Sequence, residues 1–274
     1  MTRAAAWALR ALLLLAPSPA LADIDVQGAE ELMRVSGIWG QLGDLAGQVA
    51  VDIEAEVRQS EARLPPAVAE RLIAQAKISF AGDRLRTRVR DSLVAHVDAQ
   101  HLPALLDWFK SPTGVEVVRS EQADMADLRD STLTDAEDAR RFAALTTERK
   151  AILQRLVAAS RAVDSDATLT IQMAAGVQLG LRSALSGTPR QSLDDALSAL
   201  ELKRPDMVRS IEAGENASFA RIYSSNSDAV LEDYVRFLDS PAGSHFTDME
   251  VEALSSALRE AGEDFGRAAL GNRE

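Results

Sequence analysis

The side chains most often used for metal binding and nucleophilic catalysis are scarce in this chain of 274 residues. It has no cysteine, which excludes thiol nucleophiles, CxxC redox chemistry and cysteine-based zinc sites. Its three histidines are His96, His101 and His245. On a helix, His96 and His101 would point about 140° apart and could not chelate one metal as an i, i+4 pair would. We therefore predict no metal site and no cofactor.

Two groups of carboxylates are the remaining candidates for chemistry. They are Asp164 with Asp166, and Asp194 with Asp195. Neither group continues into a calcium loop with its glycine and distal glutamate, and the GxSxG, Walker and GxGxxG motifs are absent. We interpret these acids as solvated residues of turns and helix starts, and we predict that the chain is not an enzyme. Because paired carboxylates can act as acid and base, a periplasmic hydrolase without a recognisable motif remains an alternative.

The elements that would position any site are helices. Ala, Leu, Glu, Arg and Gln dominate the sequence, and the period-2 alternation of strands is missing. Polar residues at 134–146 suggest a boundary between two parts of the chain, and Thr147 is expected to cap the helix that follows it. Residues 186–189 are predicted to form a loop. The sequence predicts an all-α protein of about ten helices, arranged as two related helical-bundle repeats with no sheet.

The repeats are predicted from two stretches, 98–114 and 227–243, which align without a gap at an offset of 129 residues. Each begins with a candidate N-cap, Asp98 or Ser227. Apolar residues then recur at helical spacing in matched pairs, namely Leu102/Leu231, Leu105/Tyr234, Trp108/Phe237 and Phe109/Leu238. We expect Trp108 and Phe237 to be buried at equivalent positions, each against the helix that follows it.

Each stretch ends in a Ser-Pro-x-Gly sequence that predicts a sharp corner between two helices. A residue before proline is displaced from the α region, so the serine leaves one helix and can cap the next. Proline then takes the first helical position, and a glycine in the first turn allows close packing. The candidate groove or structural corner therefore comprises Trp108, Phe109, Ser111, Pro112, Gly114, Tyr234, Phe237, Ser240, Pro241 and Gly243.

A short capped helix with an aromatic pair followed by x-Ser-Pro-x-Gly resembles the DUF2059 family of exported bacterial proteins. The resemblance covers 17 residues in each copy, and the second copy has Phe237-Leu238 where the first has Trp108-Phe109. It implies an all-helical exported protein with two copies of the unit, at residues 23–145 and 146–274. The family has no defined function, so the resemblance carries over no catalytic residue.

Residues 1–22 have the three parts of a signal peptide. Arg3 and Arg10 give a positive start, residues 11–16 form an apolar core, and Ala20-Leu21-Ala22 provides a small-x-small cleavage site. The apolar run is much shorter than the roughly 20 residues that a membrane span needs. We therefore expect cleavage after Ala22, a periplasmic location and no stable membrane anchor.

The charge of the chain limits its partners. It has 42 acidic and 30 basic residues and a net charge of −12, without the clustered Lys and Arg that nucleic-acid binding requires. The sequence therefore predicts a non-enzymatic binding or interaction module, with an unknown envelope protein or a small apolar ligand as its partner. A second alternative is that the chain is a carrier of lipids or acyl chains.

Overall fold

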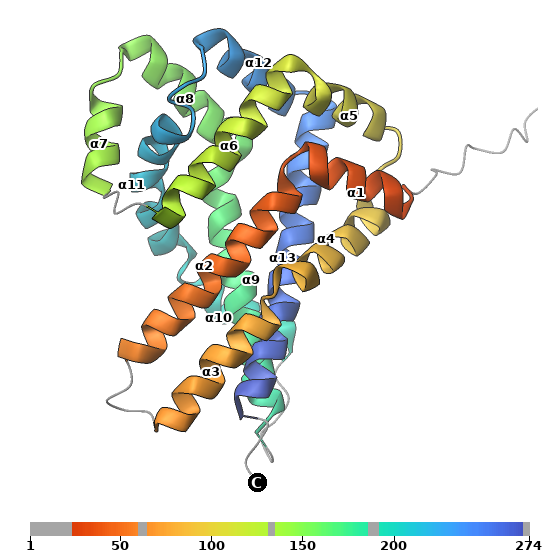
Figure 1. Ribbon diagram of the computed structural model, residues 1–274, viewed down its shortest axis with the longest axis vertical. Helices are drawn as coiled ribbons and strands as arrows, with labels where there is room; N and C mark the ends of the chain where they lie inside the picture. Colours follow the sequence, from red (N-terminus) through yellow and green to blue (C-terminus); the bar gives the residue numbers. More distant parts are fainter. Residues whose placement is uncertain (1–23, 60–64, 131–134, 186–191, 271–274) are drawn as a thin grey trace, which may run out of the picture.

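The computed structural model describes residues 24–59, 65–130, 135–185 and 192–270. Within these ranges the chain is helical almost throughout and contains no strand. The predicted all-α class is confirmed, although the sequence predicted about ten helices and the structure divides the chain into α1 to α13 (Figure 1). The predicted signal peptide and the predicted loop at 186–189 lie outside the described residues.

The helices form two groups along the chain, separated by α7 (Asp135–Ala143), which occupies the polar stretch predicted as a boundary. The N-terminal half consists of α1 (Val26–Val35), α2 (Ile38–Gln59), α3 (Pro66–Ser79), α4 (Gly82–His96), α5 (Leu102–Lys110) and α6 (Pro112–Asp130). The C-terminal half consists of α8 (Thr147–Ser160), α9 (Ala162–Ser183), α10 (Leu193–Glu201), α11 (Arg204–Ile222), α12 (Asp228–Leu238) and α13 (Pro241–Leu270).

Two predicted helix starts need correction. The cap of α8 is Thr146, whose side chain accepts a hydrogen bond from the Arg149 N–H, and not Thr147. Asp98 does not cap α5, because its carboxylate instead accepts hydrogen bonds from the backbone and side chain of Gln100, so the helix begins only at Leu102. Ser227 caps α12 as predicted, by accepting from the Val230 N–H at 3.3 Å.

The last helix of each half packs on the other half. Helix α6 contacts α11 and α12, and α13, which runs along most of the molecule in Figure 1, contacts α3, α4 and α5. Arg88 of α4 reinforces this second contact through ion pairs with Asp264 at 2.6 Å and Glu260 at 3.1 Å. The two halves therefore share their packing surfaces.

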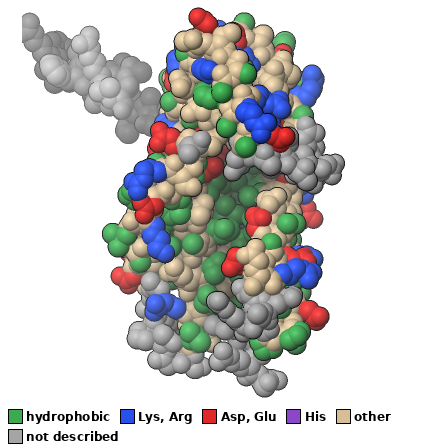
Figure 2. Space-filling model, turned by 90° about the vertical axis from the view of Figure 1, so that its left-hand side faces the viewer, with side chains coloured by type: hydrophobic (Ala, Val, Ile, Leu, Met, Phe, Trp, Pro, Cys, Tyr) green, Lys and Arg blue, Asp and Glu red, His purple; other side chains and the backbone are tan. Residues whose placement is uncertain are grey.

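One face of the molecule is hollowed. Figure 2 shows the face that is turned to the left in Figure 1, and a depression lies about midway down it, below α7. Most of the visible floor of this depression is hydrophobic. Burying an apolar surface of this kind against a ligand would release water and favour binding.

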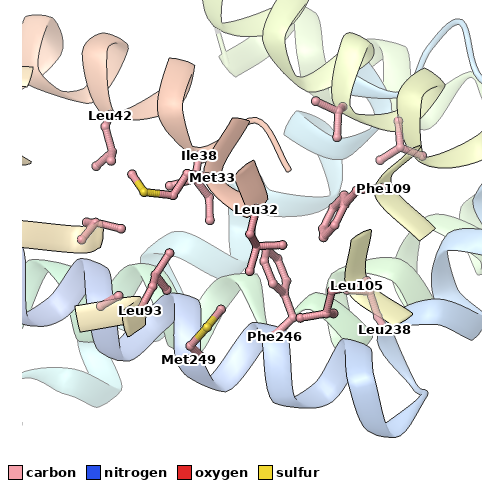
Figure 3. Close-up of a cluster of buried hydrophobic side chains, with 14 of the residues drawn as sticks. Leu32, Met33, Ile38, Leu42, Leu93, Leu105, Phe109, Leu238, Phe246 and Met249 are labelled. Atoms are coloured by element: carbon pink, nitrogen blue, oxygen red, sulfur yellow. The ribbon is translucent and has the colours of Figure 1, made fainter. Parts of the chain in front are cut away.

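The core is continuous between the halves. Figure 3 shows Leu32 and Met33 of α1, Phe109 of α5 and Phe246 of α13 converging on one region. Each is buried, and all belong to one cluster of contacting hydrophobic residues that also includes residues of α8, α11 and α12. Because this cluster is shared, a large side chain lost from one half leaves a cavity that both halves line.

Helices α9 and α13 approach each other through four glycines. A Cβ atom added at Gly176 or Gly180 of α9 would collide with backbone atoms of α13, and one added at Gly262 or Gly266 of α13 would collide with the backbone of α9. Each glycine pair is spaced four residues apart, which places both members on one helix face. The absence of side chains is therefore what allows the two backbones to touch.

The connection between the first two helices of each half contains one residue of left-handed backbone. Between α1 and α2 this residue is Gly37, with φ of +87°. Between α8 and α9 it is Arg161, with φ of +54°. Glycine adopts this conformation at no steric cost, whereas arginine does not.

Candidate functional site

The two predicted corners have the same local structure. Ser111 Oγ accepts a hydrogen bond from the Gly114 N–H, and Ser240 Oγ accepts one from the Gly243 N–H, both at 3.1 Å. Pro112 and Pro241 are the first residues of α6 and α13. The serines therefore cap the helices that follow them, as the sequence predicts.

The corner glycines allow each pair of helices to meet closely. A Cβ atom at Gly114 would collide with the carbonyl oxygen of Trp108, and one at Gly243 would collide with the carbonyl oxygen of Phe237. Since these contacts are made by backbone atoms, no rotation of a side chain could relieve them. The glycines thus fix the direction in which α5 and α12 present their aromatic rings.

The aromatic rings of the two corners meet each other. Trp108 stacks on Phe237, with ring centroids 3.9 Å apart and planes inclined by 10°, and Tyr234 stacks against Trp108 at 5.2 Å. Phe109 lies on the inner side, 5.5 Å from Phe237 and 4.9 Å from Phe246. Trp108 thus stacks on a residue of the other half, a contact that could not be predicted from the sequence.

The two equivalent aromatics differ in burial. Phe237 is buried, with 7% of its surface exposed, as predicted. Trp108 is only half-buried, so the prediction of burial is wrong for this residue. It remains accessible because one edge of the stack opens into a groove between the corners.

This groove, which we call the corner groove, has a volume of about 430 Å³. It is lined by Ala104, Trp108, Ser111, Thr113, Asp233, Arg236, Phe237, Ser240 and Ala242. Asp233 and Arg236 form an ion pair with each other, so the groove combines aromatic rings with charged and hydroxyl-bearing side chains. A groove of this size can hold one or two side chains of a partner.

Behind the aromatic stack lies a cluster of acidic and phenolic groups. Glu121 Oε1 of α6 accepts hydrogen bonds from the Tyr223 hydroxyl at 2.7 Å and the Tyr234 hydroxyl at 3.3 Å. The negative charge of Glu121 contributes to raising the pKa of Glu250 on α13. Although each glutamate residue keeps some exposed surface, burial of its carboxyl group raises its pKa to about 7. Burial also raises the pKa of each tyrosine well above its ordinary value.

The sequence contains a signal for this cluster outside the matched stretches 98–114 and 227–243. Glu121 and Glu250 differ in position by 129, the offset that relates the two corners. Both lie nine residues after the corner proline, Pro112 or Pro241, beyond the Gly114 and Gly243 at which the alignment stopped. Extending the alignment along the two following helices would have identified the pair.

Two of the acidic residues considered as candidates for chemistry lie at a helix start and beside a cleft. Asp195 forms a capping box with Ser192 at the start of α10, and Asp164 lines a small cleft between α8, α9 and α11. The Asp166 residue is exposed, and partial desolvation of its carboxyl group raises its pKa. Burial and the charge of Asp166 raise the pKa of Glu215 to about 7, and Glu215 lines a cleft of about 590 Å³ between α7 and α11.

The histidines have one unexpected contact. His101 and His245 have ring centroids 4.8 Å apart, and His245 Nε2 accepts a hydrogen bond from the Asp98 N–H at 3.2 Å. Three or more His, Asp or Glu side chains arranged to hold a metal ion are not found in the described ranges. Nor is any described helix both long and apolar enough to cross a membrane.

Comparison with known proteins gives no further assignment. No family model, curated protein or solved structure matches the chain. The resemblance to the DUF2059 family and the division into two copies of its unit therefore stay predictions.

Proposed function

We propose that the chain is a non-enzymatic binding module of the periplasm, and that its corner groove takes side chains of a partner protein of the cell envelope. The half-buried Trp108 carries this proposal. A large aromatic ring left accessible beside polar and charged groups is typical of the points at which proteins contact each other. Phe237 supports the ring from behind, which holds it in place before a partner arrives.

The proposal that the chain consists of two related units is supported by the local structure of its halves. Helix α2 contacts α3 and α4 as α9 contacts α10 and α11, and α5 contacts α6 as α12 contacts α13. The two corners also share their serine caps and close glycines. In this proposal, two DUF2059-like units at 23–145 and 146–274 together form the corner groove.

Site-specific photocrosslinking tests the partner proposal. A photoreactive phenylalanine derivative replaces Ala104, which is exposed and lines the corner groove, or Ala55, which is exposed on α2. We expect illumination of cells to join another chain to the protein at position 104 only, and Arg236→Glu to reduce this product. Equal products at both positions would contradict a specific role of the corner groove.

The proposed location is tested separately. Mass spectrometry of the protein purified from its own cells should give a chain that begins at Asp23, in the soluble periplasmic fraction. An intact chain that begins at Met1 and is recovered from the cytoplasm would rule out export.

The hollow in Figure 2 favours a second candidate function, the binding of an apolar ligand such as an acyl chain. Native mass spectrometry of the protein from its own periplasm should then show a bound lipid. The emptied protein should bind a fluorescent fatty acid saturably, at a stoichiometry near one, with displacement by palmitate. Binding that does not saturate would count against a carrier.

A further inference from the structure

A cleft of about 590 Å³ lies where α7 packs on α11, at the left of Figure 1. Within the described part of the chain, no lysine or arginine lines it. The polar groups that line it are two carboxylates, Asp138 and Glu215, and two serine hydroxyls. Sites for small molecules commonly have such a volume and combine apolar walls with a few polar groups. The apolar part of this wall consists of Ala136, Ala139, Ile211 and Ala217.

Asp138 leaves one carboxylate oxygen without a donor beside this cleft. The residue is buried, with 9% of its surface exposed. Its Oδ2 atom accepts a hydrogen bond from Arg221 Nε at 2.7 Å, whereas its Oδ1 atom is buried and has no hydrogen-bond partner among the described residues. Arg221 also pairs with Asp124, so its single positive charge is shared between two carboxylates. A buried oxygen that has lost water and gained no hydrogen bond is destabilising. A donor that enters the cleft would remove this cost.

Glu215 adds a second carboxylate to the same cleft. It belongs to α11 and is half-buried. Burial, together with the negative charge of Asp166, raises the pKa of Glu215 to about 7, so its carboxyl group is ionised at pH 8. The cleft then carries negative charge that no cation of its described wall neutralises. Charge complementarity therefore favours a cationic ligand over a neutral or anionic one.

Gly214 is a further feature that points to a ligand. It lies within α11 and lines the cleft, although glycine destabilises the interior of a helix relative to alanine. Close packing does not require a glycine here, since an added Cβ atom would meet nothing within 4 Å. At the glycines through which α9 and α13 approach each other, by contrast, a Cβ atom would collide with backbone. The missing side chain of Gly214 therefore keeps the cleft open.

We propose that this cleft binds a primary ammonium ion carried on a short apolar chain, with Asp138 and Glu215 as the acceptors of the ammonium group. An ammonium group brings three donors and a positive charge, which match an oxygen without a donor and an uncompensated carboxylate. A metal ion is a poorer match, because part of the wall is apolar and the described ranges hold no group of three or more His, Asp or Glu side chains suited to a metal. The cleft and the corner groove have no lining residue in common, so this site does not depend on the partner proposed for the groove.

An NMR titration of the full chain at pH 8 tests the proposal, with hexylammonium chloride as the probe. Hexan-1-ol and hexanoate are matched controls, because they have the same chain length with no charge or with the opposite charge. We expect hexylammonium to shift the backbone amide signals of residues 136–139 and 210–218 saturably. Both controls should bind there at least about tenfold more weakly, since they lose the hydrogen bonds from a charged donor. Equal binding of hexan-1-ol at these residues would overturn the proposal.

Two variants separate the charge of the site from its shape. Glu215→Gln removes the charge of one acceptor and should weaken the binding of hexylammonium about tenfold. Glu212→Gln makes the same change at an exposed position one helical turn away and should leave the binding unchanged. Gly214→Phe places a ring in the open space of the cleft and should abolish the binding. Gly47→Phe is its control, because a Cβ atom at that glycine of α2 also meets nothing within 4 Å.

Retained binding in a folded Gly214→Phe chain would show that the probe binds elsewhere, which contradicts the proposed site. Calcium chloride distinguishes a metal site from an ammonium site, because displacement of hexylammonium by an equimolar amount of Ca²⁺ would contradict the proposed ligand class. If Gly214→Phe does not fold, the titration of Glu215→Gln decides in its place, since glutamine adds no bulk. Unchanged binding in that variant would then overturn the proposal.

Discussion

The rings of Trp108 and Phe237 lie face to face with their centroids 3.9 Å apart. The two residues differ in position by the same 129 residues that separate the two corners. Contact between residues at matched positions of two similar corners is the relationship found at a twofold axis. The contacts around this stack are reciprocal, because α6 reaches α12 and α13 reaches α5. Glu121 and Glu250 are a second pair of residues at the same offset, and the negative charge of Glu121 contributes to raising the pKa of Glu250. The two corners therefore act as one structural unit.

The first prediction concerns the energy of this stack. Truncation of a buried aromatic to alanine costs about 3–5 kcal/mol, so Phe237→Ala should lower the unfolding free energy by an amount in that range. Trp108→Ala should cost less, about 1–3 kcal/mol, because the ring is only half-buried and less apolar surface is removed from contact. Urea unfolding measures both changes.

Asp107→Ala is the matched control for the stack, since Asp107 is the exposed neighbour of Trp108 on α5. It should change the stability by less than about 0.5 kcal/mol. If Trp108→Ala were as mild as the control while the crosslinked product at position 104 disappeared, Trp108 would serve binding alone. The proposed contribution of the stack to stability would then be wrong.

A second prediction concerns the contact between α9 and α13. Gly176→Ala should destabilise the protein strongly, because the added Cβ would collide with the carbonyl oxygen of Arg259 and must force the helices apart. Gly47→Ala is the control, as a Cβ there meets nothing within 4 Å. In that helix alanine should stabilise the chain by up to about 1 kcal/mol. Opposite shifts of the melting temperature are expected, and two shifts of the same sign would contradict the packing described.

The local structure of the corners could be predicted from the sequence because it depends on neighbouring residues. The caps at Ser111 and Ser240 and the helix starts at Pro112 and Pro241 follow from bonds within three or four residues. The start of α5 was predicted wrongly for a related reason. The Asp98 side chain can bind the local backbone in more than one way, and its carboxylate accepts from Gln100 instead of capping the helix.

The contacts between the halves could not be predicted in the same way. Tyr223 and Glu121 are 102 residues apart, and no local propensity brings them together. The stacking of Trp108 on Phe237 likewise depends on how α5 and α12 pack, which the apolar spacing of each helix does not specify. The 129-residue offset pairs Glu121 with Glu250, but only the tertiary structure shows that two phenol hydroxyl groups meet Glu121.

The third prediction is a pH effect outside the corners. Burial and the charge of Asp166 raise the pKa of Glu215 to about 7, so the folded chain binds an extra proton between about pH 4.5 and 7. The stability attributable to Glu215 must therefore decrease as the pH rises through this range. Glu215→Gln should raise the melting temperature at pH 8 and leave it nearly unchanged at pH 5.

Glu212→Gln is the control for Glu215, because it makes the same change of charge at an exposed position one helical turn away. Its effect on melting should be small at both pH values. An equal gain from Glu212→Gln at pH 8 would show that the effect comes from the net charge of the acidic chain and not from the burial of Glu215.

The last prediction compares the two left-handed residues. For a residue with a Cβ atom this conformation costs roughly 1–2 kcal/mol, so Gly37→Ala should be destabilising by at least that amount. Its Cβ would also lie 3.1 Å from Val118 Cγ1. Arg161→Gly should relieve the cost of the conformation. It also removes the ion pair with Asp248 and the hydrogen bond to Ser244 Oγ.

These lost contacts decide the net effect at Arg161. The ion pair is exposed, and such pairs contribute about 0–1 kcal/mol. Relief of the backbone should therefore equal or exceed the loss, and Arg161→Gly should be neutral or stabilising by up to about 1 kcal/mol. Arg161→Ala loses the same contacts without the relief, so it should be less stable than Arg161→Gly in urea unfolding. If the alanine variant proved the more stable of the two, residue 161 would not have the left-handed backbone described.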